Sequence, residues 1–170
     1  MSDTPSQTAQ TEDLVVKRIL DAPLERVWQA WADPEQVMRW WGPKYYTCPS
    51  ARIDLRQGGR YVFAMRAPQE QGAQVSYISG VYKVVVPMQL LEFGQSLSDE
   101  DGNLIDPAQE GMPPGFPLET RTTVAFRTIR DMTELTVTEY DWPVSQMMIY
   151  SFAGLHQMVD KLSEALSRES

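Results

Sequence analysis

The residues 144–168, VSQMMIYSFAGLHQMVDKLSEALSR, predict one long helix against which the rest of the chain packs. Six apolar side chains recur at alternating steps of four and three, which puts them on one helical face: Met148, Phe152, Leu155, Val159, Leu162 and Leu166. Pro143 precedes the segment, and Lys161 and Arg168 lie toward its C-terminal end, where cations suit the helix dipole. A helix of about 24 residues spans roughly 36 Å, so its apolar face needs a broad cover.

Two interpretations of this helix are open from the residues alone. It is either an ordinary core helix or one wall of a cavity. Met147, Gly154 and Met158 flank the apolar face. Flexible thioether side chains beside a glycine would leave a soft-walled space between the helix and whatever covers it.

The bulk composition is that of a single globular domain. The chain has 170 residues, 42% of them hydrophobic and 22% charged. Its net charge of −8 argues against nucleic acid and anionic membranes as partners, because both select clustered Lys and Arg. Cys48 is the one cysteine, which excludes an intrachain disulfide. With no apolar run of about 18 residues and no signal-peptide pattern, we predict a cytoplasmic protein without a membrane span.

Before the long helix, the chain predicts a tail, a strand, two short helices and then strands in hairpins. Residues 1–12 are polar and predict a disordered tail, which leaves 13–170 as one domain. A strand over 14–20 precedes a helix that begins at Pro23 and a second, short helix from Pro34 through Trp40. Four of the five tryptophans lie in the 14 residues 28–41, which belong to this pair of short helices, called the helical corner below. We therefore expect the helical corner to be buried or to line a pocket.

From residue 51 the apolar period changes to two, which is typical of strands. The predicted strands cover 53–55, 60–65, 75–86, 90–97, 119–129 and 133–140. Gly80, in the middle of one of them, indicates a bulge or a close approach by another group. Residues 98–118 are rich in proline and acidic residues and predict a long surface loop, a candidate lid over the mouth of the fold. The fold class is α+β, with a curved antiparallel sheet of about six to seven strands wrapped around the long helix.

Several motifs resemble those of the START-like helix-grip (SRPBCC) superfamily, and within it the branch homologous to activators of the 90-kDa heat-shock chaperone ATPase. They are Ala22-Pro23-x-x-x-Val27-Trp28-x-Ala30-Trp31, Trp40-Trp41-Gly42-Pro43, Gly58-Gly59-Arg60-Tyr61, Gly80-x-Tyr82 and Gly154-Leu155 followed by Lys161-Leu162. The resemblance covers roughly residues 13–168. It implies the helix-grip fold. It also implies a cavity under the helix, where members of the superfamily bind lipids, steroids, polyketides or plant hormones and some catalyse cyclisation.

The residues provide little for catalysis or for binding metals and cofactors. His156 is the only histidine, so a His-rich metal site is excluded, and Gly58-Gly59 joins two strands instead of opening a phosphate-binding helix. Glu119, Glu134 and Glu139 are interpreted as residues of the solvated sheet face. We therefore predict no catalytic residue, no metal site and no cofactor.

The candidate site is instead a cavity wall, drawn from the helical corner, the sheet and the long helix. Its predicted members are Trp41, Tyr45, Phe63, Met65, Tyr82, Phe93, Phe126, Tyr140, Trp142, Met148, Phe152, His156 and Met158. Such a lining suits a small hydrophobic ligand with few polar groups. The alternatives left open are a filled aromatic core, a cyclase or hydrolase that uses His156, and a chaperone co-factor or interaction module with a protein partner or a second copy.

Overall fold

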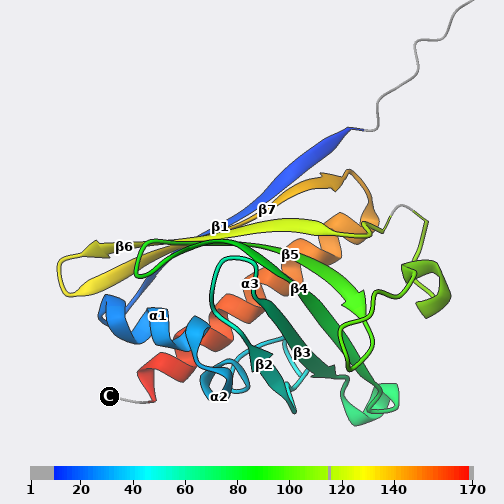
Figure 1. Cartoon of the computed structure of the whole chain (residues 1–170), viewed down its shortest axis with the longest axis horizontal. Helices are drawn as coiled ribbons and strands as arrows, with labels where there is room; N and C mark the ends of the chain where they lie inside the picture. Colours follow the sequence, from blue (N-terminus) through cyan, green and yellow to red (C-terminus); the bar gives the residue numbers. More distant parts are fainter. Residues whose placement is uncertain (1–9, 115, 169–170) are drawn as a thin grey trace, which may run out of the picture.

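The computed structural model describes residues 10–114 and 116–168, which form a seven-stranded antiparallel sheet with one long helix across a face (Figure 1). The strands are β1 (Thr11–Leu20), β2 (Ala51–Ile53), β3 (Arg60–Arg66), β4 (Val75–Val86), β5 (Leu90–Ser98), β6 (Thr120–Ile129) and β7 (Met132–Pro143). The helices are α1 (Leu24–Ala32), α2 (Pro34–Val37) and α3 (Gln146–Ser167), with 3-10 turns at Gln69–Gln71 and Pro107–Glu110. The predicted α+β architecture is confirmed. No helix of the described residues is long and apolar enough to cross a membrane.

The strand order is β1-β7-β6-β5-β4-β3-β2, so only β1 pairs with a strand distant in sequence. β1 begins earlier than predicted, because Thr11 and Glu12 pair with Pro143 and Trp142 of β7. These two residues therefore do not belong to a disordered tail, whereas residues 1–9 of that predicted tail lie outside the described part of the chain. Helix α2 stops at Val37 and does not reach Trp40, since the chain continues there in hydrogen-bonded turns.

The helical corner is buried against the sheet, as its tryptophans predicted. Asp33 ends α1 and caps α2, where its carboxylate accepts a hydrogen bond from the Glu35 N–H at 3.0 Å. The Trp40 indole donates to the Ala30 carbonyl at 3.0 Å, and its ring meets that of Trp31 edge-on at 4.6 Å. This pairing satisfies a buried indole N–H and fixes the chain between α2 and β2.

The C-terminal part of α3 is the firmly packed part. Leu155, Met158, Val159, Leu162 and Leu166 are buried there. In Figure 1 this end of α3, in red, lies beside α1, and the Arg26 guanidinium donates to the Leu166 carbonyl at 2.6 Å. The first turns of α3 lie instead beside the segment that joins β5 to β6. In these first turns Met147, Met148 and Phe152 are only partly buried against the core, and the start of α3 is capped by the Ser145 hydroxyl, which accepts from the Met148 N–H.

Aromatic rings fill the space under β3, β4 and β5. Tyr61 is 1% exposed and its ring lies 4.7 Å from Phe63, 5.4 Å from Tyr82 and 5.5 Å from Phe93. Its hydroxyl crosses β4 to donate to the Gly94 carbonyl of β5 at 2.6 Å. The crossing requires Gly80, because a Cβ there would lie 1.8 Å from that carbonyl oxygen. The close approach predicted at Gly80 is confirmed.

Candidate functional site

A cavity of about 520 Å³ lies between the first half of α3, the inner face of the sheet and the β5–β6 segment. Its walls are mostly apolar, and they are formed by Trp41, Gly42, Pro43, Tyr46, Met65, Ile78, Gln95, Ser96, Leu97, Met112, Phe116, Pro117, Thr120, Glu139, Trp142, Met147, Tyr150, Ser151, Ala153, Gly154, Leu155, Gln157 and Met158. Tyr150, 63% exposed, stands at its rim. The cavity therefore opens to solvent near the start of α3.

The residue types on the side of α3 that faces the cavity leave space between the helix and the opposite wall. Met147, Gly154 and Met158 succeed one another there at helical spacing, and all three line the cavity. Gly154 carries no side chain, and a Cβ at that position would be 3.7 Å from the Pro43 Cβ, an ordinary contact distance. At Gly154, the gap between α3 and Pro43 is therefore just wide enough for one methyl group.

We expect Gly154→Ala to raise the free energy of unfolding by about 0.5–1 kcal/mol, because alanine favours the helix and fits without strain. Urea unfolding followed by circular dichroism measures the change. Gly42→Ala is the contrasting variant. Gly42 has a φ of +101° and its Cβ would lie 3.4 Å from the Tyr46 Cβ, so alanine there should destabilise the protein. A destabilised Gly154→Ala variant would contradict this account of the cavity wall.

The corner wall, residues 41–46, is held to α3 by the Lys161 ammonium. Nζ of Lys161 donates to the carbonyls of Tyr46 at 2.9 Å and Gly42 at 3.1 Å, and more weakly to those of Trp41 and Pro43, both at 3.4 Å. Burial lowers the pKa of Lys161 below its usual value. Gln157 adds a second tie by accepting from the Lys44 N–H at 3.1 Å. Lys161 and Gln157 of α3 thus both hold the corner wall in position.

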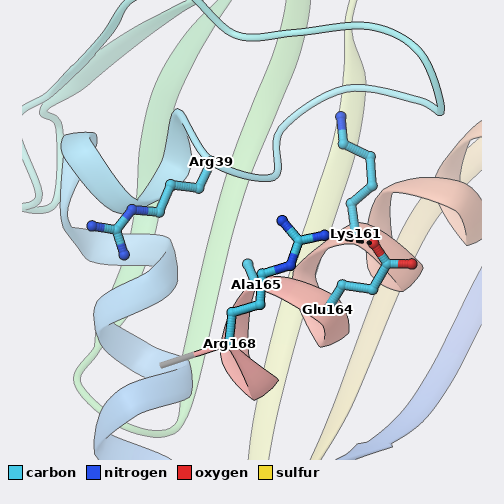
Figure 2. A pocket seen from close by; sticks show the side chains of 5 residues that line it. All are labelled: Arg39, Lys161, Glu164, Ala165 and Arg168. Atoms are coloured by element: carbon cyan, nitrogen blue, oxygen red, sulfur yellow. Dashed lines mark ion pairs between the residues drawn. The ribbon is translucent and has the colours of Figure 1, made fainter. Parts of the chain in front are cut away.

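A second hollow, of about 510 Å³, lies on the other side of Lys161, between α3 and Arg39 (Figure 2). Its side chains do not converge on a common point. Figure 2 shows the Lys161 amine turned toward the corner and the Arg39 guanidinium pointing away from α3. Arg168 pairs with Glu164 at 3.8 Å. Because the cations diverge or are already paired, this hollow is a poor site for an anion.

Glu139 is the polar feature of the first cavity. Its Oε1 accepts from the Trp142 indole N–H at 3.0 Å and its Oε2 from the Gln95 amide at 3.3 Å. The same amide nitrogen donates to the Thr122 hydroxyl at 2.7 Å. Burial raises the pKa of Glu139, and the two hydrogen bonds partly oppose that rise. The prediction that Glu139 lies on the solvated face is therefore wrong.

Of the thirteen predicted wall residues, the structure brings Trp41, Met65, Trp142 and Met158 together at the cavity. Four others are buried but pack away from it, because they contact other core rings: Phe63, Tyr82, Phe93 and Phe126. The cavity end of the sheet is thus distinct from the filled aromatic end.

The remaining five predicted residues lie outside the cavity. Met148, Phe152 and His156 lie on another side of α3, where the Phe152 and His156 rings are 4.7 Å apart and His156 is exposed. Tyr45 is 73% exposed on a turn with a φ of 73°. Tyr140 packs under the Arg121 guanidinium, 4.2 Å from its ring centre, on the opposite face of the sheet from Glu139.

Residues that sequence reasoning missed include Glu139, Gln95 and Phe116. For Glu139 a signal existed, because it shares its strand parity with the buried Leu135 and Val137, whereas Glu134 does not. Phe116 comes from the β5–β6 segment, whose lack of periodicity gave no indication of direction. Its ring meets that of Trp142 edge-on at 5.9 Å.

Comparisons with known proteins agree with this fold. Residues 21–167 match the family described as Activator of Hsp90 ATPase homolog 1-like protein. No curated protein matches the chain. This family match confirms the resemblance to the chaperone-activator branch that was drawn from the sequence motifs.

Three solved structures illustrate the likeness. A protein from Nitrosomonas europaea has a TM-score of 0.72 and 21% identity, over 92% of this chain and 95% of that chain. One from Arthrobacter aurescens has 0.73 and 23%, over 92% and 86%. The AHSA1 protein from Silicibacter pomeroyi has 0.72 and 19%, over 94% and 100%. At these identities the likeness shows a shared fold alone.

Proposed function

For this chain, which belongs to the Activator of Hsp90 ATPase homolog 1-like family, we propose the binding of a small, mostly apolar molecule between α3 and the sheet. The observation that carries the proposal is the cavity of about 520 Å³ beside Met147, Gly154 and Met158. Ligand pockets of proteins range from about 300 to 1,000 Å³ and are lined mainly by apolar side chains with a few polar groups. The cavity fits both criteria.

The β5–β6 segment fits the role of a lid over this cavity. Met112, Phe116 and Pro117 contribute to its wall. Among its described residues, the pairing with a strand is confined to the bridge between Ser98 and Leu104 and the neighbouring bond from the Ile105 N–H to the Leu97 carbonyl. A segment with few backbone ties opens at a lower cost than a strand of the sheet. Entry of a ligand past Phe116 would therefore leave the sheet itself intact.

We expect Met158→Trp to abolish ligand binding while changing the free energy of unfolding by less than about 1 kcal/mol, because the indole enters empty space. The measurement is native mass spectrometry of protein purified from its own host. A bound ligand would appear as extra mass of a few hundred daltons on the wild type, which is the size of molecule that pockets of this volume hold. Met148→Trp makes the same change on a side of α3 that does not line the cavity, and it should retain the ligand.

Two results would count against the proposal. The wild type could carry no ligand, which would favour the alternative role as a chaperone co-factor or other interaction module. Met158→Trp could instead cost about 1–3 kcal/mol, as overpacking of a filled core does. The alternative enzyme that uses His156 has no support from the position of that residue, which lies outside the cavity.

A further inference from the structure

The carboxyl group of Glu139 is the one charged group among the described residues that line the cavity. Three other glutamates of the sheet region have cationic partners: Glu92 pairs with Arg121 at 2.9 Å, Glu119 with Lys83 at 3.1 Å and Glu134 with Arg127 at 3.2 Å. Within the described part of the chain, Glu139 is in no ion pair and accepts only from two neutral donors, Trp142 and Gln95. The Glu139 carboxyl group thus has no cationic partner among the described residues.

No Lys, Arg or His of residues 10–114 and 116–168 lines the cavity around Glu139. The Lys161 ammonium is held by four carbonyls of the corner, and Arg121 stacks on Tyr140 across the sheet. A ligand carboxylate or phosphate would therefore meet a negative group with no compensating positive one. An anionic ligand is disfavoured.

A positively charged group would be favoured by two features together. A carboxylate already oriented by two hydrogen bonds forms a strong charge-assisted hydrogen bond with an ammonium group. The rings of Trp41, Phe116 and Trp142 line the same cavity, and aromatic faces attract cations. Burial disfavours the charged form of the Glu139 carboxyl in the empty cavity, and an arriving cation removes that cost.

We infer that the ligand of this cavity is a hydrophobic amine, whose protonated nitrogen binds the Glu139 carboxylate while its apolar body fills the space beside Met147 and Met158. The inference rests on the proposed function and adds the chemical class of the ligand. Gln95 and Trp142 act as positioning residues, because they hold the two carboxylate oxygens of Glu139.

Three probes with one ring system test the inference by isothermal titration calorimetry at neutral pH: naphthalen-1-ylmethylamine, naphthalen-1-ylmethanol and naphthalene-1-carboxylic acid. We expect the wild type to bind the amine at least about tenfold more tightly than the alcohol, and the acid most weakly. Glu139→Gln should reduce the affinity for the amine to about that for the alcohol, with the alcohol itself changed by less than about threefold. Glu134→Gln, on the outer face of the same strand, should leave the preference intact.

The outcomes separate the inference from the proposed function. Equal affinities for amine and alcohol in the wild type, or a preference that survives Glu139→Gln, would overturn the amine inference alone. A second result would also overturn the amine inference but keep the proposed function: none of the probes binds, yet the wild type carries a native ligand that Met158→Trp loses. If no probe binds and no native ligand is found, both fall. The wild-type comparison needs no variant, so it holds even if Glu139→Gln folds poorly.

Discussion

We expect Lys161→Met to lower the free energy of unfolding by about 2–3 kcal/mol, because it leaves the carbonyls of residues 41–43 and 46 without their ammonium donor. Methionine keeps most of the length and packing of the side chain, so the lost hydrogen bonds dominate the effect. The two shortest of these bonds, to Tyr46 and Gly42, join α3 to a segment that has few other ties to it. For a domain of this size we expect the melting temperature to fall by about 5–10 °C.

Thermal and urea unfolding, followed by tryptophan fluorescence, measure this loss. Lys83→Met is the matched control, because Lys83 forms a single exposed ion pair with Glu119 at 3.1 Å. Such surface pairs contribute at most about 1 kcal/mol. Similar stabilities for Lys161→Met and the wild type would show that the corner is held by packing instead of by the ammonium. A weaker binding of ligand in Lys161→Met is also expected, since Trp41 and Tyr46 line the cavity.

The Leu162→Ala variant should lose about 3 kcal/mol of stability. Leu162 is 0% exposed in the firmly packed half of α3, and alanine there would leave a cavity among the surrounding core side chains. Ile149→Ala removes a side chain of similar size from the same helix, but Ile149 is 55% exposed and should cost less than about 1 kcal/mol. Urea unfolding of both variants gives the comparison. Equal losses would mean that α3 is packed uniformly along its length, contrary to the structure.

The elements of the fold could be predicted because their periods are local properties of the sequence. The strand over 75–86 was predicted with its observed bounds, and the long helix was predicted within two residues at its start. Apolar side chains at alternate positions of a strand, or at steps of three and four in a helix, indicate which face is buried. This holds even when the element that covers that face is unknown. The missed start of β1 at Thr11 has the opposite cause. Polar residues extend that strand only because β7 offers them backbone hydrogen bonds.

The site was less predictable from the sequence, because a cavity forms where neighbouring side chains leave space unfilled, and this depends on how distant segments pack. The aromatic residues Phe63 and Tyr82 have the composition of a binding wall, yet they contact other rings and leave no space. On α3 the cavity is lined by Met147, Gly154 and Met158, the flank that the sequence offered as one of two interpretations, and by Leu155 of the apolar stripe. The predicted stripe residues Met148 and Phe152 do not line it, because a helical period alone does not say which part of a face meets open space. Glu139 could have been assigned to the inner face by parity with Val137. The expectation that carboxylates are solvated outweighed that signal.

The pairing of β1 with β7 has a consequence for how the chain acquires its structure during synthesis. The Thr133 hydroxyl donates to the Ala22 carbonyl, a contact that spans 111 positions and lies at the end of that strand pair. β1 leaves the ribosome long before β7 is translated, so this partly apolar strand stays unpaired while the residues between the two strands are synthesised. Long-range pairing of this kind is slow to form and exposes strand edges meanwhile. Translation speed and chaperone access, rather than final stability alone, should therefore govern the yield of folded protein.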